Sequence, residues 1–280
     1  MLALLKRNFL LYFRNRSGVF FSLFGALISF ILYIIFLQKN LTDAWAQLPN
    51  SAPMLNNWLM SGTLAVTGIT TSLAALTQLV KDREHQVDQD LYLSDQGKWR
   101  LAFSYLTSAI IISFSMQILM YVLMCGYFRE VPTLSLLPEV LLIMLLSSLL
   151  SSLVNVIFVY FFQSVDSLGK FSTIVGTASG FLVGTYVPLG VLPNFAQLLM
   201  KCTPATYIAA LYRQVLMKEA LSETFKGQDK LLQEFQEKMG VQLKWQTLLT
   251  KEQTYLIVLG GILLALGIWI SLAKRSSKRK

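Results

Sequence analysis

The residue types that carry out chemistry in enzymes are few in this sequence. Its 280 residues include one histidine, His85, and two cysteines, Cys125 and Cys202. A zinc site needs three or four nitrogen or sulfur ligands held together, and this set is too small to supply them. Ser179 lies in the glycine-rich string Gly176–Gly180 but lacks the G-x-S-x-G spacing of a nucleophile elbow. We therefore expect neither a metal site nor catalytic residues in this chain.

Nucleotide chemistry is equally unsupported. The G-x-x-x-x-G-K-[ST] phosphate loop does not occur, because Gly97-Lys98 is followed by Trp99 and Gly169-Lys170 by Phe171. Carboxylates, histidines and arginines, which ion-coupled carriers hold at membrane depth, are almost absent from the apolar runs. If the protein transports a compound, the sequence therefore predicts that a partner supplies the energy.

The elements that must position the remaining polar residues are membrane helices. Hydrophobic residues make up 54% of the chain and charged residues 14%, against about a quarter in soluble domains. Runs of about 20 apolar residues are long enough to cross a bilayer. The sequence predicts an all-α integral membrane protein, one domain over residues 1–280, with six transmembrane helices at 17–37, 57–80, 101–126, 136–163, 171–192 and 255–273.

The distribution of basic residues predicts the orientation. Fourteen Lys and Arg lie in the N-terminal segment, in 81–100, in 164–170 and in the tail, whereas 38–56 and 127–135 contain only Lys39 and Arg129. Short cytoplasmic segments carry the excess of Lys and Arg. Both termini are therefore expected in the cytoplasm of a multi-pass protein of the plasma membrane.

Three segments outside the runs have their own patterns. Residues 1–16 place Leu5, Phe9, Tyr12 and Phe13 roughly on one side of a helix and Arg7 and Arg14 on another, as in an interfacial helix. Acids and apolar residues interleave in 81–100, which favours a short cytoplasmic helix that offers a polar face to a soluble protein, with a solvated loop as the alternative. Residues 193–254 are expected to form an extracytoplasmic helical segment.

The fifth run combines small residues with helix breakers. Gly176, Gly180 and Gly184 form a G-x-x-x-G-x-x-x-G ridge of the kind that lets two membrane helices approach closely. Pro188 and Pro193 follow and are expected to break the helix near the outer face, either to open onto a cavity or to turn the chain.

The ordered set of these features resembles the membrane subunits of ATP-binding-cassette exporters, the type 2 permease class with the type V exporter fold. The resemblance covers the whole chain and is strongest in GTYVPLGVLPNFAQLLMKCTPATYIAALYRQ, with Pro188, Pro193, Pro204, Tyr207 and Arg213. The stretch DLYLSDQGKWRLAFSYLTSAIIIS is also family-like, although Asp95-Gln96 stands where many members have a proline.

The resemblance implies two permease subunits, as a homodimer or heterodimer, and two cytoplasmic ATPase subunits that bind ATP and Mg²⁺. Residues 81–100 would then be a coupling helix, with candidate ATPase contacts at Asp82, Arg83, Glu84, Gln86, Asp90 and, from the N-terminal helix, Arg7. Arg7 and Arg14 could instead bind anionic membrane lipids.

For the substrate pathway, polar residues of the second and fifth runs are the candidates: Thr63, Thr67, Thr70, Thr71, Thr177 and Tyr186. The glycine ridge would lie at the dimer seam. Because the membrane runs contain so few charges, we predict an apolar or amphipathic cargo. The alternative is that these threonines and glycines serve only to pack helices. Two other classes compete, a membrane anchor that recruits a soluble partner and an intramembrane lipid-modifying enzyme. We expect no nucleic-acid partner.

Overall fold

The structure, a computed structural model, describes residues 1–39, 43, 51–93, 97–129 and 134–278. These residues form helices and turns, with one isolated bridge between Lys244 and Leu248. The expected all-α class is confirmed. Asp95 and Gln96 lie outside the described residues.

The described residues form a series of helices. In chain order they are α1 Leu2–Arg14, α2 Arg16–Leu32 with a π-helical turn at Tyr33–Leu37, α4 Ser51–Glu84, α5 Val87–Leu93, α6 Gly97–Phe128, α7 Leu137–Val159, α8 Val165–Leu182, α9 Asn194–Lys201, α10 Pro204–Leu216, α11 Lys218–Thr224, α12 Asp229–Lys238 and α13 Lys251–Lys278.

Five helical segments are long and apolar enough to cross a membrane: Arg16–Leu37, Ala52–Glu84, Trp99–Phe128, Leu137–Val159 and Lys251–Lys274. They correspond to five of the six predicted spans. The remaining predicted span, the fifth in chain order at 171–192, has different bounds in the structure. Helix α8 begins at Val165 and ends at Leu182, and turns follow it, including a 3-10 turn at Leu189–Val191. Asp166 and Lys170 near its start lower the hydropathy of α8, which is 18 residues long.

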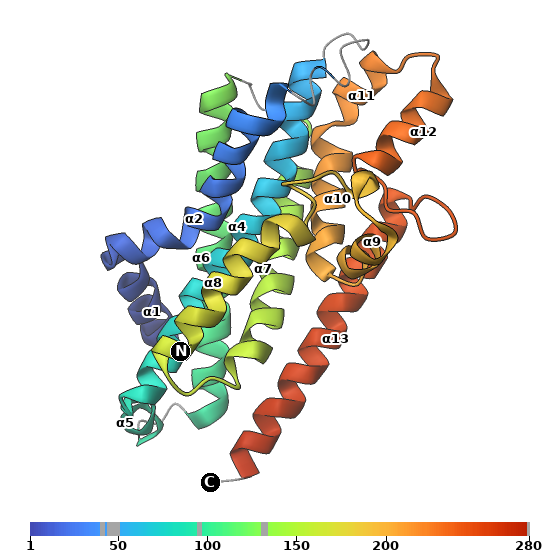
Figure 1. Cartoon of the computed structure of the whole chain (residues 1–280). Coiled ribbons are helices and arrows are strands. Elements are labelled where there is room, and N and C mark those ends of the chain that lie inside the picture. Colours follow the sequence, from blue (N-terminus) through green and yellow to red (C-terminus); the bar gives the residue numbers. More distant parts are fainter. Residues whose placement is uncertain (40–42, 44–50, 94–96, 130–133, 279–280) are drawn as a thin grey trace.

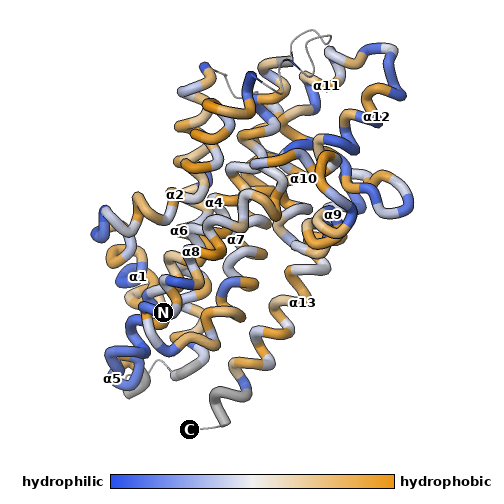
Figure 2. The backbone as a smooth tube through the Cα atoms, in the orientation of Figure 1, coloured by the Kyte–Doolittle hydropathy of each residue, from blue (hydrophilic) through white to orange (hydrophobic). Residues whose placement is uncertain are grey.

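Both chain ends lie toward the end of the bundle that carries α5, and α11 and α12 lie at the opposite end (Figure 1). The end of the bundle near α5 and the opposite end near α11 and α12 are more hydrophilic than its middle, which is largely hydrophobic (Figure 2). We call these two regions the α5 end and the α12 end. This arrangement fits the predicted placement of both termini on one side of the membrane.

Helix α4 is the centre of the bundle, in contact with α2, α6, α7, α8 and α10. Small residues allow this. A Cβ atom at Gly68 would lie 2.6 Å from the hydroxyl of Ser147 in α7, so only glycine lets the two helices approach so closely. Buried hydroxyls such as Thr67 and Thr71 donate to carbonyls four residues earlier in α4, which satisfies them without a partner helix.

The segment predicted to be extracytoplasmic, 193–254, is only partly peripheral. Helix α10 is buried along most of its length and packs against α4, α7 and α13. Helices α11 and α12 instead cover a separate apolar cluster that includes Tyr33, Trp58 and Phe235. The indole nitrogen of Trp58 donates to the carbonyl oxygen of Met239 at 2.7 Å, which ties α4 to the end of α12.

The three glycines of the predicted ridge have three different roles. The α8 backbone at Gly176 approaches Gly25 of α2, where a Cβ atom on Gly25 would lie 3.2 Å from the Gly176 carbonyl oxygen. Gly180 makes room for the ring of Tyr186, and Gly184 has a φ of +70°, which turns the chain after α8. The described contacts of Gly180 and Gly184 are therefore within the subunit, and the dimer seam stays a prediction.

Gly180→Ala should destabilise the fold, because the new Cβ would lie 2.2–2.6 Å from the ring atoms of Tyr186. We expect a loss of about 1–3 kcal/mol, as for overpacked cores, seen as a lower melting temperature in detergent. Gly169→Ala in the same helix is the control, since its Cβ would meet open space. Tyr186→Ala should make Gly180→Ala harmless, and additive losses in the double variant would contradict the contact.

Candidate functional site

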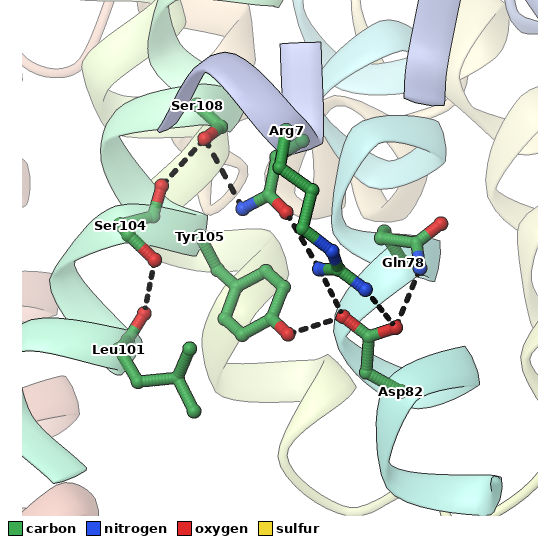
Figure 3. Close-up of polar contacts among 8 residues, drawn as sticks. Arg7, Gln78, Asp82, Leu101, Ser104, Tyr105 and Ser108 are labelled. Carbon is green, nitrogen blue, oxygen red and sulfur yellow. Dashed lines mark hydrogen bonds and ion pairs between the residues drawn. The ribbon is translucent and has the colours of Figure 1, made fainter. Parts of the chain in front are cut away.

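The α5 end of α4 carries a carboxylate that faces inward. Asp82 is 3% exposed, and its two oxygens accept hydrogen bonds from both terminal nitrogens of Arg7 at 2.7 and 2.8 Å. The hydroxyl of Tyr105 and the amide nitrogen of Gln78 also donate to it, the latter at 2.7 Å (Figure 3). Four donors thus saturate one buried carboxylate, which we call the Asp82 cluster.

The Asp82 cluster joins three helices. Arg7 comes from α1, Gln78 and Asp82 from α4, and Tyr105 from α6. The hydrogen bonds that Arg7 donates to the Asp82 carboxylate raise the pKa of the Arg7 guanidinium above its usual value, so Arg7 stays charged. A buried ion pair adds little net stability, but removing one partner strands a buried charge and is costly. The cluster therefore fixes the position of α1 against the bundle.

A neighbouring contact extends the attachment of α1 to α6. The side-chain amide of Asn8 donates to the hydroxyl of Ser108 at 3.4 Å, and Ser108 donates to the Ser104 carbonyl oxygen at 2.6 Å (Figure 3). Leu4 and Asn8 are the buried residues of α1, whereas Arg14 is exposed. Arg7 is thus engaged within the subunit, whereas Lys6 and Arg14 are the exposed basic residues of α1.

Arg83 and Glu84 connect the same end of α4 to the α7–α8 junction. Arg83 donates to the carbonyl oxygen of Phe162 at 2.9 Å, just beyond the last turn of α7. A carboxylate oxygen of Glu84 accepts from the backbone nitrogen of Val165 at 3.0 Å, at the first residue of α8. Both contacts use backbone groups that helix ends leave unsatisfied. The end of α4 is therefore linked to α1, α6, α7 and α8.

The predicted cytoplasmic helix is present as α5, seven residues long, which packs against α4 and α6. A turn at His85–Gln86, with Gln86 at a φ of +59°, redirects the chain between α4 and α5. Among the side chains that the structure describes at this turn and on α5, the exposed ones are Glu84, His85, Gln86, Gln89 and Asp90. Of the predicted coupling residues, Glu84, Gln86 and Asp90 are thus at the surface, Arg83 is half-buried, and Asp82 is internal.

The predicted pathway residues separate into two groups. Thr63, Thr67 and Thr71 are buried inside the bundle. Thr70 and Thr177 line a groove of about 500 Å³, which we call the α2–α8 groove. Its lining includes Phe21, Phe24, Gly25 and Ile28 from α2, Thr70, Leu73 and Thr77 from α4, and Gly169, Thr173, Gly176 and Thr177 from α8.

Tyr186, the remaining predicted pathway residue, belongs neither with the buried threonines Thr63, Thr67 and Thr71 nor with the residues that line the α2–α8 groove. It is 8% exposed, and its ring fills the space above Gly180 and meets Phe181 edge-on at 4.8 Å. It stabilises the turn after α8.

Arg213 is a residue whose role the sequence pattern did not reveal. It is fully buried in α10 and donates to the carbonyl oxygens of Gly184 at 2.8 Å, Val183 at 3.2 Å and Gly240 at 3.1 Å. Its guanidinium lies 5.0 Å from the centre of the Trp58 ring. It therefore joins the end of α8 to α4 and to the residues after α12. The sequence feature that could have indicated this buried role is the presence of an arginine within the apolar stretch IAALYRQVLM.

A polar chain inside the bundle was also missed. Tyr212 of α10 donates to the amide oxygen of Gln117 in α6 at 2.7 Å, and the amide nitrogen of Gln117 donates to Ser148 of α7 at 2.7 Å. Asn155 of α7 donates to the hydroxyl of Ser72 in α4 at 2.8 Å. These bonds hold α4, α6, α7 and α10 as one unit. Single Asn and Gln residues in apolar runs gave no indication of their partners.

Fold and site together define an all-helical, multi-pass membrane protein with a polar end built around α4 and α5. The sequence matches the family described as ABC-2 family transporter protein over residues 37–269, more than four-fifths of the chain. The chain belongs to this family and is a membrane subunit of an ABC transporter. A search of the curated proteins finds no match.

Asp82→Ala should destabilise the protein by about 3–5 kcal/mol, the usual cost of breaking a buried ion pair. Arg7→Ala should cost at least as much, because it leaves the Asp82 carboxylate, whose side chain is 4% exposed, without its charged partner, whereas Asp82→Ala leaves an Arg7 side chain that is 30% exposed. Denaturant titration in detergent measures both, and Arg14→Ala on the exposed face of α1 is the matched control. Equal stability of Asp82→Ala and wild type would show that the cluster does not hold α1.

Proposed function

We propose that this chain is the permease subunit of an ATP-driven exporter, which moves an apolar or amphipathic compound out of the cell with energy from a separate cytoplasmic ATPase. The observation that carries the proposal is the construction of the α5 end. Glu84, Gln86 and Asp90 are exposed there, on a turn and short helix whose base is bonded to four other helices.

This construction suits the transmission of force. A soluble partner bound to the exposed residues of α5 would pull on the end of α4. Since the Asp82 cluster holds α1 and α6, and Arg83 and Glu84 hold the α7–α8 junction, a shift of that end moves these elements as well. Packed helices respond to such a shift by rigid-body motion.

The α2–α8 groove supports the cargo part of the proposal. Its walls are mostly apolar, with hydroxyls from Thr70, Thr77, Thr173 and Thr177, and no charged residue is among its described lining. A groove of this composition suits a drug, a lipid-like metabolite or a hydrophobic peptide. A second copy of the subunit, or a related one, would close its open side. A membrane anchor without transport would have no use for such a groove.

Charge reversal on α5 should uncouple the permease from its ATPase. We expect Glu84→Lys combined with Asp90→Lys to abolish co-purification with the partner ATPase, and to abolish cargo-stimulated ATP hydrolysis in proteoliposomes. Glu234→Lys is the matched control, because Glu234 is exposed on α12 at the opposite end. Unchanged assembly and hydrolysis in the double variant would refute the coupling assignment.

Filling the α2–α8 groove should block transport without preventing assembly. Thr177→Trp places a large ring in the groove at an exposed position, so the fold should tolerate it. We expect the efflux of apolar dyes to fall at least tenfold, with the ATPase still bound. Leu263→Trp, on an exposed face of α13, is the control. If the Thr177→Trp variant exports dye at the wild-type rate, the α2–α8 groove is not part of the substrate pathway. The assignment of α5 as the ATPase contact would still stand.

A further inference from the structure

A second groove runs along α6 and α7, apart from both sites described above. It has a volume of about 820 Å³, and its described lining is apolar except at one end. Ile118, Val122 and Cys125 line it from α6, and Leu137 and Leu141 line it from α7. Arg129, which follows α6, is the one charged residue among the described lining.

The dimensions of this groove match one leaflet of a membrane. From Ile118 to Phe128, the last residue of α6, the helix rises ten steps of 1.5 Å, or roughly 15 Å, and Arg129 follows directly. The hydrocarbon of a single leaflet is about 15 Å thick, half of a core of about 30 Å. An extended acyl chain that begins at the level of Arg129 would therefore reach Ile118 near the bilayer midplane. A compact cargo molecule would leave much of this length empty.

Arg129 supplies a charge at the position of a lipid headgroup. Its side chain is exposed, and it forms no ion pair with a residue that the structure describes. A guanidinium recognises phosphate through two parallel hydrogen bonds. A guanidinium above an apolar cleft between membrane helices places a positive charge at the depth of a lipid phosphate.

We propose that the α6–α7 groove is a binding site for one anionic phospholipid, with an acyl chain between α6 and α7 and its phosphate at Arg129. The site would hold the lipid in the leaflet at the α12 end. This inference is independent of the proposed export function, because neither α5 nor the α2–α8 groove contributes to it.

Cys125 provides a reporter inside the groove. In a Cys202→Ser variant it is the single thiol, and a bound chain should cover it. In nanodiscs that contain phosphatidylglycerol, we expect alkylation of Cys125 by N-ethylmaleimide to be several-fold slower than in pure phosphatidylcholine. Arg129→Gln should abolish this difference, whereas Lys39→Gln, at another exposed cation, should preserve it.

A Cys125→Ser variant, whose single thiol is the exposed Cys202 outside the groove, measures any general effect of membrane charge on the reaction. Its alkylation rate should differ little between the two lipids. Equal rates for Cys125 in both membranes, or a slowing that persists in Arg129→Gln, would overturn the proposal. Protection of Cys125 by an exported dye in pure phosphatidylcholine would also overturn it, because the groove would then bind cargo.

Discussion

The burial of the Asp82 carboxylate is the constraint on which the arrangement of this subunit depends. A charged group removed from water is tolerated only when it is paired and hydrogen-bonded. Asp82 therefore requires Arg7 of α1, Gln78 of α4 and Tyr105 of α6 to stay in place. The apolar face of α1 alone would let the helix slide along the membrane surface. The carboxylate gives it one position.

The helices around α4 form two groups. One group, α6, α7 and α10, is joined to α4 and to each other by internal hydrogen bonds, and the other, α2 and α8, encloses a groove with α4. Gln117, Tyr212 and Asn155 join α4, α6, α7 and α10 through hydrogen bonds in an apolar interior. Helices α2 and α8 contact α4 and enclose the α2–α8 groove with it. Arg213 marks the boundary, since it holds the end of α8 to α10.

The sequence predicted what depends on periodicity and composition, and missed what depends on partners distant in the chain. Apolar runs locate five of the membrane helices, and the interleaved charges after the second run locate α5. The glycine ridge indicated close packing at Gly176, yet the space at Gly180 is filled by Tyr186, six residues later. Asp82 looked like a surface acid because its neighbours are charged. Arg7, 75 residues away, makes it internal, and sequence spacing carries no trace of that pairing.

The most direct test asks whether the Asp82 cluster transmits work or only supports the fold. Asp82→Asn keeps the size of the side chain but removes its charge, and leaves the exposed residues of α5 unchanged. In the assembled transporter we predict that this variant binds its ATPase and hydrolyses ATP, while the amount of cargo exported per ATP falls severalfold. Export per ATP equal to that of the wild type, in a properly folded variant, would contradict the account.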